Sequence, residues 1–178
     1  MFIGNEVENQ FAIQDITMPT EEAIDAQVAS GTLTEDDADE LEEFAGESLD
    51  NGPAARAYAD HYILAHMNAS GKALAGEPVT YEEASAKGRE LSAAVAENPD
   101  ATQEQIDEAA AWMDLRESLF MGNTLRGLLL YGFAFATIGT IAGIAAVLAF
   151  IGAVVFLILG VLGLRHAKAV AQSDGAAV

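Results

Sequence analysis

The side chains in this sequence that could do chemistry are few, and their spacing does not assemble a site. His61 and His66 are five residues apart, which excludes the two-histidine metal site that an i, i+4 spacing on one helix face allows. We expect each to be a surface or partly packed histidine. The dipeptide Asp60–His61 does not indicate a catalytic triad, because no serine stands with it at a suitable spacing.

The densest group of carboxylates runs from Glu35 to Glu40 and could suggest a calcium site. An EF-hand loop needs alternating ligands, a central glycine and a glutamate at its twelfth position, and this run lacks them. The solvated face of a helix explains the run better. We therefore expect no catalytic residue, no bound metal and no cofactor, and the sequence predicts that the protein is not an enzyme.

The stretch that dominates the chain is an uncharged run of 38 residues, Gly127–Leu164. A helix needs about 20 apolar residues to cross a bilayer, so the run is too long for one span. A hairpin of two spans would need a turn in lipid near residues 137–143, where no proline, asparagine, aspartate or charge occurs. We expect one span, roughly Ile141–Leu164, and the hairpin remains the alternative.

Residues suited to the membrane surface flank the predicted span. We expect Thr124–Thr140 to form a helix at or above the interface, because its aromatic rings suit that level. We expect Gly122 and Asn123 to kink or break the chain before it; the alternative is a helix that runs unbroken from Gln103 into the membrane. The basic side chains that follow the span are expected to meet lipid headgroups. The predicted interfacial residues are Trp112, Arg126, Tyr131, Arg165, His166 and Lys168.

Small residues recur along the span at alternating steps of three and four. Such a stripe lets a second helix approach closely, which is how helices associate in lipid. Glycine and alanine are common throughout this stretch, so chance also produces part of the pattern. The stripe is interrupted once, by Phe156, and we expect it to pack against another helix. The residues predicted to do so are Gly139, Ala142, Gly143, Ala146, Ala149, Ala153, Gly160 and Gly163.

Charge is distributed unevenly along the chain. Residues 1–117 carry 27 of the 28 acidic residues and five of the eight basic ones, which gives this region a net charge of −22. Such a surface repels nucleic acid, so we expect no direct nucleic-acid binding by the acidic region. The abundant carboxylates, scarce lysine and absent cysteine resemble a protein of a halophilic archaeon, in which carboxylates hold water at high salt.

Residues 1–18 scatter apolar side chains among polar ones, and residues 11–14 alternate briefly, as a strand would. No partner strand is visible in the sequence. We expect either an extended arm that docks on another protein or a frayed terminus with a few residues tucked onto the helices. The residues that would make the docking contact are Phe2, Ile3, Val7, Phe11, Ile13 and Ile16.

Residues 19–121 are predicted to form an acidic domain of short helices, because threonines stand at their expected starts. The predicted fold is all-α, with helical hairpins in this acidic N-terminal region followed by a long C-terminal transmembrane helix. The predicted domains are an arm at 1–18, the acidic domain at 19–121, the interfacial helix and anchor at 122–165, and a polar tail at 166–178. The expected helix caps are Thr20, Thr34, Thr80 and Thr102.

Residues 21–45 show the clearest hairpin pattern. One helical stretch ends at Gly31, which suits a left-handed C-cap, and Thr34 caps the acidic stretch that follows. This segment resembles the short oligomerisation motif found near the ends of many prokaryotic proteins. The resemblance implies that the chain self-associates.

Two features of the sequence disagree about which side of the membrane holds the acidic domain. Met1–Gln10 has neither the basic nor the apolar region of a signal peptide, so we expect insertion through the C-terminal segment and an acidic domain left in the cytoplasm. The basic cluster at residues 165–168 favours a cytoplasmic tail instead. We expect the acidic domain on the cytoplasmic side.

An acidic helical domain followed by a glycine- and alanine-rich C-terminal span resembles the small virion membrane proteins of haloarchaeal icosahedral viruses with an internal membrane. The resemblance covers the architecture of the whole chain and rests on no single motif. It implies a structural protein that anchors a protein shell to the virion's internal membrane, with its N-terminal region against the shell. The implied partners are the lipid bilayer, the capsid shell and further copies of the chain.

Two other functions remain open at the level of sequence. The first is a cellular, membrane-anchored adaptor of a haloarchaeon, located in the cytoplasmic membrane and self-associating through its helices. The second is a small oligomeric pore. A pore needs polar side chains along its span, and none occurs between Thr140 and Leu164.

Overall fold

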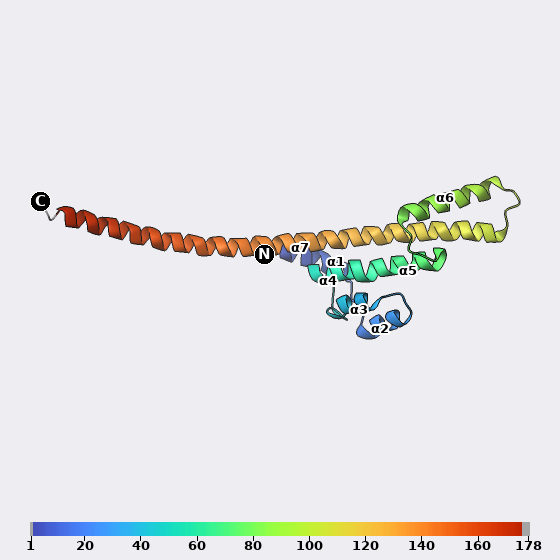
Figure 1. The fold of residues 1–178 in the computed structure, drawn as a ribbon, viewed down its shortest axis with the longest axis horizontal. Helices are drawn as coiled ribbons and strands as arrows, with labels where there is room; N and C mark the ends of the chain where they lie inside the picture. The colour runs from blue at the N-terminus through green and yellow to red at the C-terminus, as the bar shows by residue number, and fades with distance from the viewer. Residues whose placement is uncertain (1, 176–178) are drawn as a thin grey trace. The chain divides into compact units, whose positions relative to one another are not determined.

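The part of the chain that the structure describes is built of helices joined by short loops, and the predicted all-α fold is confirmed (Figure 1). The computed structural model describes the backbone of residues 2–175 and the side chains of residues 5–169, and these residues form no strand. The elements in chain order are α1 (Phe2–Gln14), α2 (Glu21–Ala29), α3 (Glu35–Glu42), α4 (Gly52–Ala57), the π-helix η1 (Tyr58–Ile63), α5 (Leu64–Ala75), α6 (Tyr81–Glu97) and α7 (Gln103–Gly175).

The described residues divide into two units, which share the helix α7. One unit, Phe2–Ala136, contains α1 to α6 and the first part of α7. We call it the packed unit. The other unit begins at Thr137 and consists of the remainder of α7. We call its residues 137–169, whose side chains are described, the anchor segment. The packed unit therefore extends beyond the domain boundary that the sequence predicted at residue 121.

Threonine begins four of the helices, as the sequence predicted, because its hydroxyl accepts a hydrogen bond from a backbone N–H that has no partner inside the helix. At α3, α6 and α7 the cap is reciprocal, since a carboxylate or amide three residues later accepts from the threonine N–H in return. The pairs are Thr34 with Asp37, Thr80 with Glu83 and Thr102 with Gln105.

The packed unit is built on α7. The continuous helix α4–η1–α5 runs antiparallel along it, so that Met67 lies at Gly122 and Gly52 lies at Ala136. A Cβ on Gly52 would stand 2.8 Å from the Ala136 Cβ, which cannot move aside, and one on Gly122 would stand 2.6 Å from the Met67 sulfur, which would have to shift. The two helices therefore approach each other more closely than larger side chains allow.

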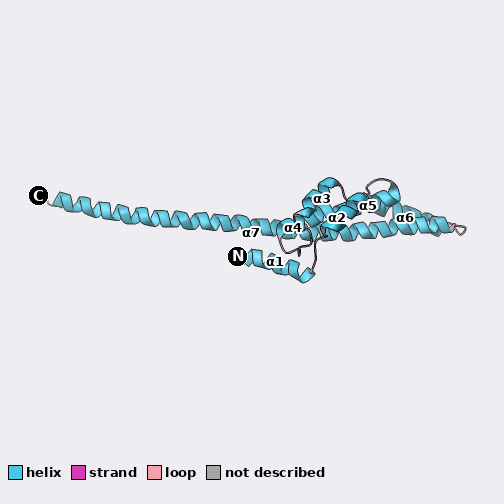
Figure 2. Cartoon of the chain, turned by 90° about the horizontal axis from the view of Figure 1, so that it is seen from below, coloured by secondary structure: helices cyan, strands magenta, loops and turns pink. Residues whose placement is uncertain are grey.

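A second helix, α6, packs antiparallel against the start of α7 (Figures 1 and 2). Gly88 meets Met113, and the rings of Tyr81 and Phe120 lie 5.9 Å apart. The guanidinium of Arg116 stacks over Tyr81 at 5.8 Å from the ring centre. This contact forms a small apolar cluster of its own around Leu115 and Leu119.

The hairpin α2–α3 closes the core on the far side of α4 and η1. Ile24 and Leu41 from its two helices are completely buried, and they join the main cluster with the buried residues of α4. The chain enters and leaves the hairpin side by side, because Met18 N–H donates to the Glu47 carbonyl and Leu49 N–H donates to the Ile16 carbonyl, both at 2.8 Å. Helix α3 ends at Glu42.

The extended arm predicted for residues 1–18 is wrong, because residues 2–14 form the helix α1. Val7 and Phe11 are one helical turn apart and both turn inward, and Phe11 is buried in the main cluster. Ile16 is also packed there, whereas Ile13 is 73% exposed. The side chains of Phe2 and Ile3 lie outside the described ones. Burial of Phe11 favours a helix over an extended arm, because a helix places Phe11 and Val7 on the same face, toward α7.

The predicted break at Gly122 and Asn123 is also wrong, because α7 continues through both residues. A helix contact explains this, since Gly122 provides the flat surface on which Met67 packs. The segment 124–140 is consequently part of α7 rather than a separate interfacial helix. The alternative of two spans joined by a turn fails for the same reason, because residues 137–143 are helical.

Replacing Gly52 by alanine should destabilise the packed unit. The added Cβ meets Ala136 and the Phe133 backbone, and such overpacking costs about 1–3 kcal/mol. The matched control is Gly127→Ala on α7, where a Cβ meets nothing within 4 Å and alanine should stabilise the helix by about 0.5–1 kcal/mol. Thermal unfolding of the full chain in detergent, followed by near-ultraviolet circular dichroism, should shift in opposite directions for the two variants.

Candidate membrane anchor and its junction with the packed unit

The anchor segment exposes nearly all of its large apolar side chains. Phe150, Phe156 and Leu164 are 72%, 76% and 68% exposed. Helix α7 is the one candidate membrane span among the described residues, with an 18-residue window whose mean hydropathy is 3.0 and whose residues are not buried. A helix of this length and composition can cross a bilayer, and its exposed side chains are those that lipid would cover.

The small residues of the predicted stripe occupy one side of this helix by their spacing. Gly139 and Gly143 are buried, whereas the last two glycines of the stripe have no neighbour in the described residues. A Cβ on Gly160 or Gly163 would meet nothing within 4 Å. Ala142, Ala146, Ala149 and Ala153 are likewise exposed. Packing of this stripe against another helix stays a prediction.

Arg126 joins α7 to the π-helix η1, a role that the sequence did not indicate. Its Nε donates to the Ala59 carbonyl and its Nη2 donates to the Asp60 carboxylate, each at 2.9 Å. The side chains of Arg126 and Asp60 are 20% and 30% exposed, so the pair is only partly screened by water. Arg56, on the same turn as Asp60, lies 3.9 Å from its other oxygen and stacks over Phe133 of α7.

The π-helix explains why an arginine is useful at this place. In a π-turn each N–H bonds to the carbonyl five residues earlier, and Leu64 N–H accordingly donates to the Ala59 carbonyl. That oxygen has a second lone pair, and Arg126 uses it. The extra residue of the π-turn also places Tyr58 against Tyr62, and their rings stack with centres 4.8 Å apart. Burial raises the pKa of Tyr58, and the nearby Tyr62 raises it further.

His61 connects the same π-helix to the acidic hairpin. Its Nδ1 donates to Asp37 Oδ1 at 3.1 Å, and Asp37 also accepts from the hydroxyl and the backbone N–H of Thr34. Partial burial alone would raise the pKa of Asp37, but the bonds from Thr34 and His61 outweigh it, and the pKa of this carboxyl lies below its usual value. The expected partly packed histidine thus has a defined partner.

The structure separates the residues predicted to lie at the membrane surface. Trp112 packs against the cluster formed by α6 and α7, and Arg126 is engaged with η1. Tyr131 is 67% exposed. Nineteen residues separate Trp112 from Tyr131 on one helix, or about 28 Å along its axis, so the two cannot share one interfacial layer across an upright helix. Arg165, His166 and Lys168 are exposed on α7 after the apolar run.

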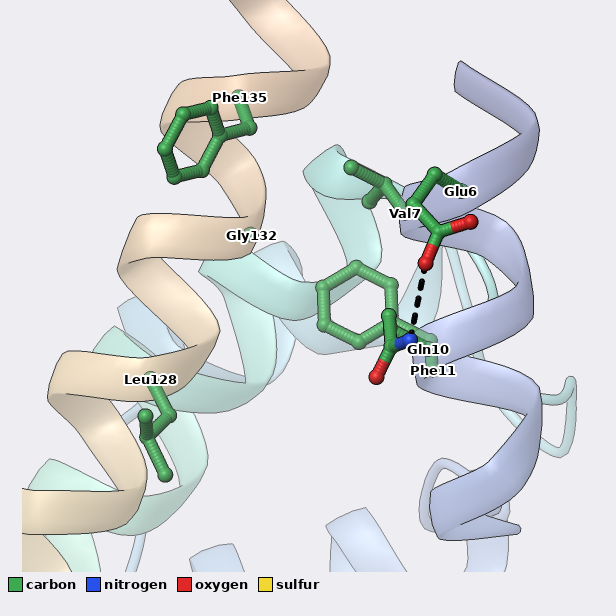
Figure 3. A pocket seen from close by; sticks show the side chains of 7 residues that line it. All are labelled: Glu6, Val7, Gln10, Phe11, Leu128, Gly132 and Phe135. Atoms are coloured by element: carbon green, nitrogen blue, oxygen red, sulfur yellow. Dashed lines mark hydrogen bonds between the residues drawn. The ribbon is translucent and has the colours of Figure 1, made fainter. Parts of the chain in front are cut away.

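An apolar groove lies between α1 and α7 in the packed unit, and sequence reasoning did not find it (Figure 3). The ring of Phe11 points from α1 toward Gly132 of α7, where a Cβ would collide with it. Leu128 and Phe135 stand one turn to either side of Gly132. The regular spacing of Val7 and Phe11 was the signal that could have revealed a helix here.

The described residues contain no group of three or more histidine, aspartate or glutamate side chains that could hold a metal ion. The acidic run at residues 35–40 lies on α3, where Asp37 is engaged by Thr34 and His61. Comparison with protein-family models, with curated proteins and with solved structures gives no match to this chain. The function must therefore be argued from the arrangement of the anchor segment and the packed unit.

Replacing Arg126 by methionine should destabilise the contact between η1 and α7. The change leaves the Asp60 carboxylate partly buried with only the distant Arg56 beside it, which costs about 1–3 kcal/mol. Arg126→Lys should recover little of this stability, because one ammonium group cannot reproduce the two hydrogen bonds that the guanidinium donates to Ala59 and Asp60. Adding Asp60→Asn to Arg126→Met should recover part of the loss in thermal unfolding. If the stability losses of Arg126→Met and Asp60→Asn simply add in the double variant, the two side chains do not interact directly.

The link between Asp37 and its partners should make the hairpin sensitive to acid. A carboxyl whose pKa is lower in the folded state stabilises that state above its unfolded pKa of about 4, and this stabilisation disappears as the pH falls through the folded pKa. Asp37→Asn should cost about 1–2 kcal/mol at pH 7, and this cost should shrink progressively as the pH falls below the unfolded pKa of about 4. Amide hydrogen exchange of residues 35–42 measures this difference, with the exposed Asp36→Asn as control.

Proposed function

We propose that this protein is a membrane-anchored structural protein, in which the anchor segment crosses a bilayer and the packed unit stands at its surface. The observation that carries this proposal is that α7 belongs to both units: it is the helix on which α4–η1–α5 and α6 pack, and it is also the apolar span. A protein built in this way ties whatever binds its packed unit to a membrane. No chemistry is required of it.

The finer proposal concerns where this happens. We propose that the chain belongs to a halophilic virus and fastens a protein shell to an internal membrane, with the packed unit on the shell side. The supporting features are the architecture of the chain and a packed unit whose surface is densely acidic, which suits water-poor, salt-rich surroundings. In this proposal the acidic surface contacts the shell, because Phe11 of the predicted docking arm is buried in the core.

A cellular adaptor in the cytoplasmic membrane of a haloarchaeon is the second candidate. The feature that favours it is the hairpin α2–α3, whose sequence resembles an oligomerisation motif and whose acidic face is exposed. Quantitative mass spectrometry of purified virus particles and of host membranes distinguishes the two candidates. A fixed stoichiometry to the shell protein supports the viral candidate, whereas enrichment in membranes of uninfected cells contradicts it.

Placing two arginines in the anchor segment should release the protein from membranes. Each arginine near the centre of a span costs about 2.5–3.5 kcal/mol, so Ile151→Arg with Val155→Arg should move the full chain from the membrane pellet into the supernatant after an alkaline wash. The matched control is Leu74→Arg with Ile106→Arg, two exposed apolar residues of the packed unit. Retention of the anchor variant in the pellet would contradict the proposed anchor.

Protease protection on intact membranes or particles should show the two ends on opposite sides. With a tag at each end, we expect cleavage of the N-terminal tag and protection of the C-terminal one, because a single helix places the ends across the bilayer. The reverse pattern keeps the single span and places the packed unit on the lumenal side. Cleavage of both tags, or protection of both in sealed membranes, would contradict a single crossing.

A further inference from the structure

The groove between α1 and α7 lies wholly inside the packed unit and has a volume of about 300 Å³. Figure 3 shows its two walls: Val7 and Phe11 project from α1, while Leu128 and Phe135 project from α7 on either side of Gly132. The Phe11 ring covers Gly132, and the two walls stay apart around it. The space is therefore open and not filled by any described side chain.

The chemistry of the groove favours a hydrocarbon ligand. Its polar residues are Glu6 and Gln10, which are exposed at the rim, and the Gln10 amide donates to the Glu6 carboxylate at 3.0 Å. The remaining lining is aliphatic or aromatic, apart from Gly132. A polar ligand or an extended peptide would find only these two rim side chains as partners, and burying its other donors and acceptors unpaired is unfavourable.

The α7 wall leads directly into the apolar run. Leu128, Gly132 and Phe135 follow steps of four and three, and the same alternation continues in the sequence to Gly139 and Ala142. No charged residue interrupts this face after Arg126. A hydrocarbon chain that already lies against the anchor segment would meet the groove wall without crossing a polar barrier.

The length of the uncharged run fits this arrangement. As one helix, its 38 residues extend about 57 Å, whereas the hydrocarbon core of a bilayer is about 30 Å thick. The excess lies at the start of the run, where Leu128, Tyr131 and Phe135 are 62%, 67% and 58% exposed within the packed unit. These side chains need an apolar covering that the described residues do not supply.

We propose that the groove between α1 and α7 binds one hydrocarbon chain of a membrane lipid. The proposal rests on the proposed membrane anchor and adds a specific lipid-binding site to it. A single lipid chain is narrow, needs no hydrogen bonds and is supplied by the membrane in which the neighbouring segment lies.

The test uses the full chain in phosphatidylglycerol vesicles that contain a trace of lipid with a diazirine in the middle of one acyl chain. After illumination, mass spectrometry locates the adducts. We expect adducts on the anchor segment, and a second set on Val7, Phe11 and Leu128. Adducts on the anchor segment without any on these three residues would overturn the groove and leave the anchor standing. Absence of adducts from the anchor segment would overturn both proposals.

Two variants with tryptophan in α1 decide whether the groove itself holds the chain. Val7→Trp fills the groove and should lower the adducts at Phe11 and Leu128 at least tenfold, with the anchor adducts unchanged. Ile13→Trp adds the same ring on the same helix at a 73% exposed position that does not line the groove, and should change nothing. Equal labelling in the two variants would refute the site.

Two further controls distinguish lipid bound in the groove from lipid that merely touches α1. Leu128→Trp fills the groove from the α7 wall and should also remove the Phe11 adducts, so that the result does not depend on how α1 tolerates substitution. Adducts spread evenly around α1, including Asn9 and Ile13, would show that α1 lies in the lipid interface by itself, and this would overturn the groove. Amide hydrogen exchange of residues 5–14 verifies that α1 remains folded on α7 in each variant.

Discussion

The guanidinium of Arg126 reaches from α7 to η1 and bonds two acceptors there at once, although 66 residues separate it from Asp60 in the sequence. This contact lies between two glycine positions, Gly122 and Gly52, at which an added Cβ would meet the opposite helix. The close approach of the helices and the two hydrogen bonds of the Arg126 guanidinium depend on each other, because Arg126 can reach Ala59 only when the helix backbones are near. The remaining helices pack on the pair that this contact aligns.

Much of the fold could be predicted from local signals, and the failures have a common physical cause. Threonine caps at Thr20, Thr34, Thr80 and Thr102 begin helices where expected, because capping involves only neighbouring residues. Arg126, Trp112 and Phe11 make contacts in the packed unit that the sequence did not indicate, because these contacts depend on tertiary partners. A lone arginine before an apolar run suits a membrane surface equally well, and only the position of Asp60 assigns it to the packed unit.

The long apolar helix was predictable because composition and length suffice, whereas its continuity through residues 122 and 123 was not. Gly122 and Asn123 have low helix propensity, yet α7 continues through them since Met67 packs on Gly122. The groove between α1 and α7 was beyond sequence reasoning for a similar reason. It requires Phe11 and Gly132 to meet, and no local pattern relates two residues so distant in the chain.

Helix α7 follows α1 to α6 in the chain, and this order has a consequence for how the protein is made. Helices α1 to α6 are synthesised before the surface on which they pack, and at a translation rate of about 5–20 residues per second the packed part of α7 follows within seconds. During that interval the apolar faces of α5 and α6 have no partner. Completion of the core and emergence of the membrane segment therefore coincide, so the nascent chain needs protection from aggregation at the very stage when it must be delivered to a bilayer.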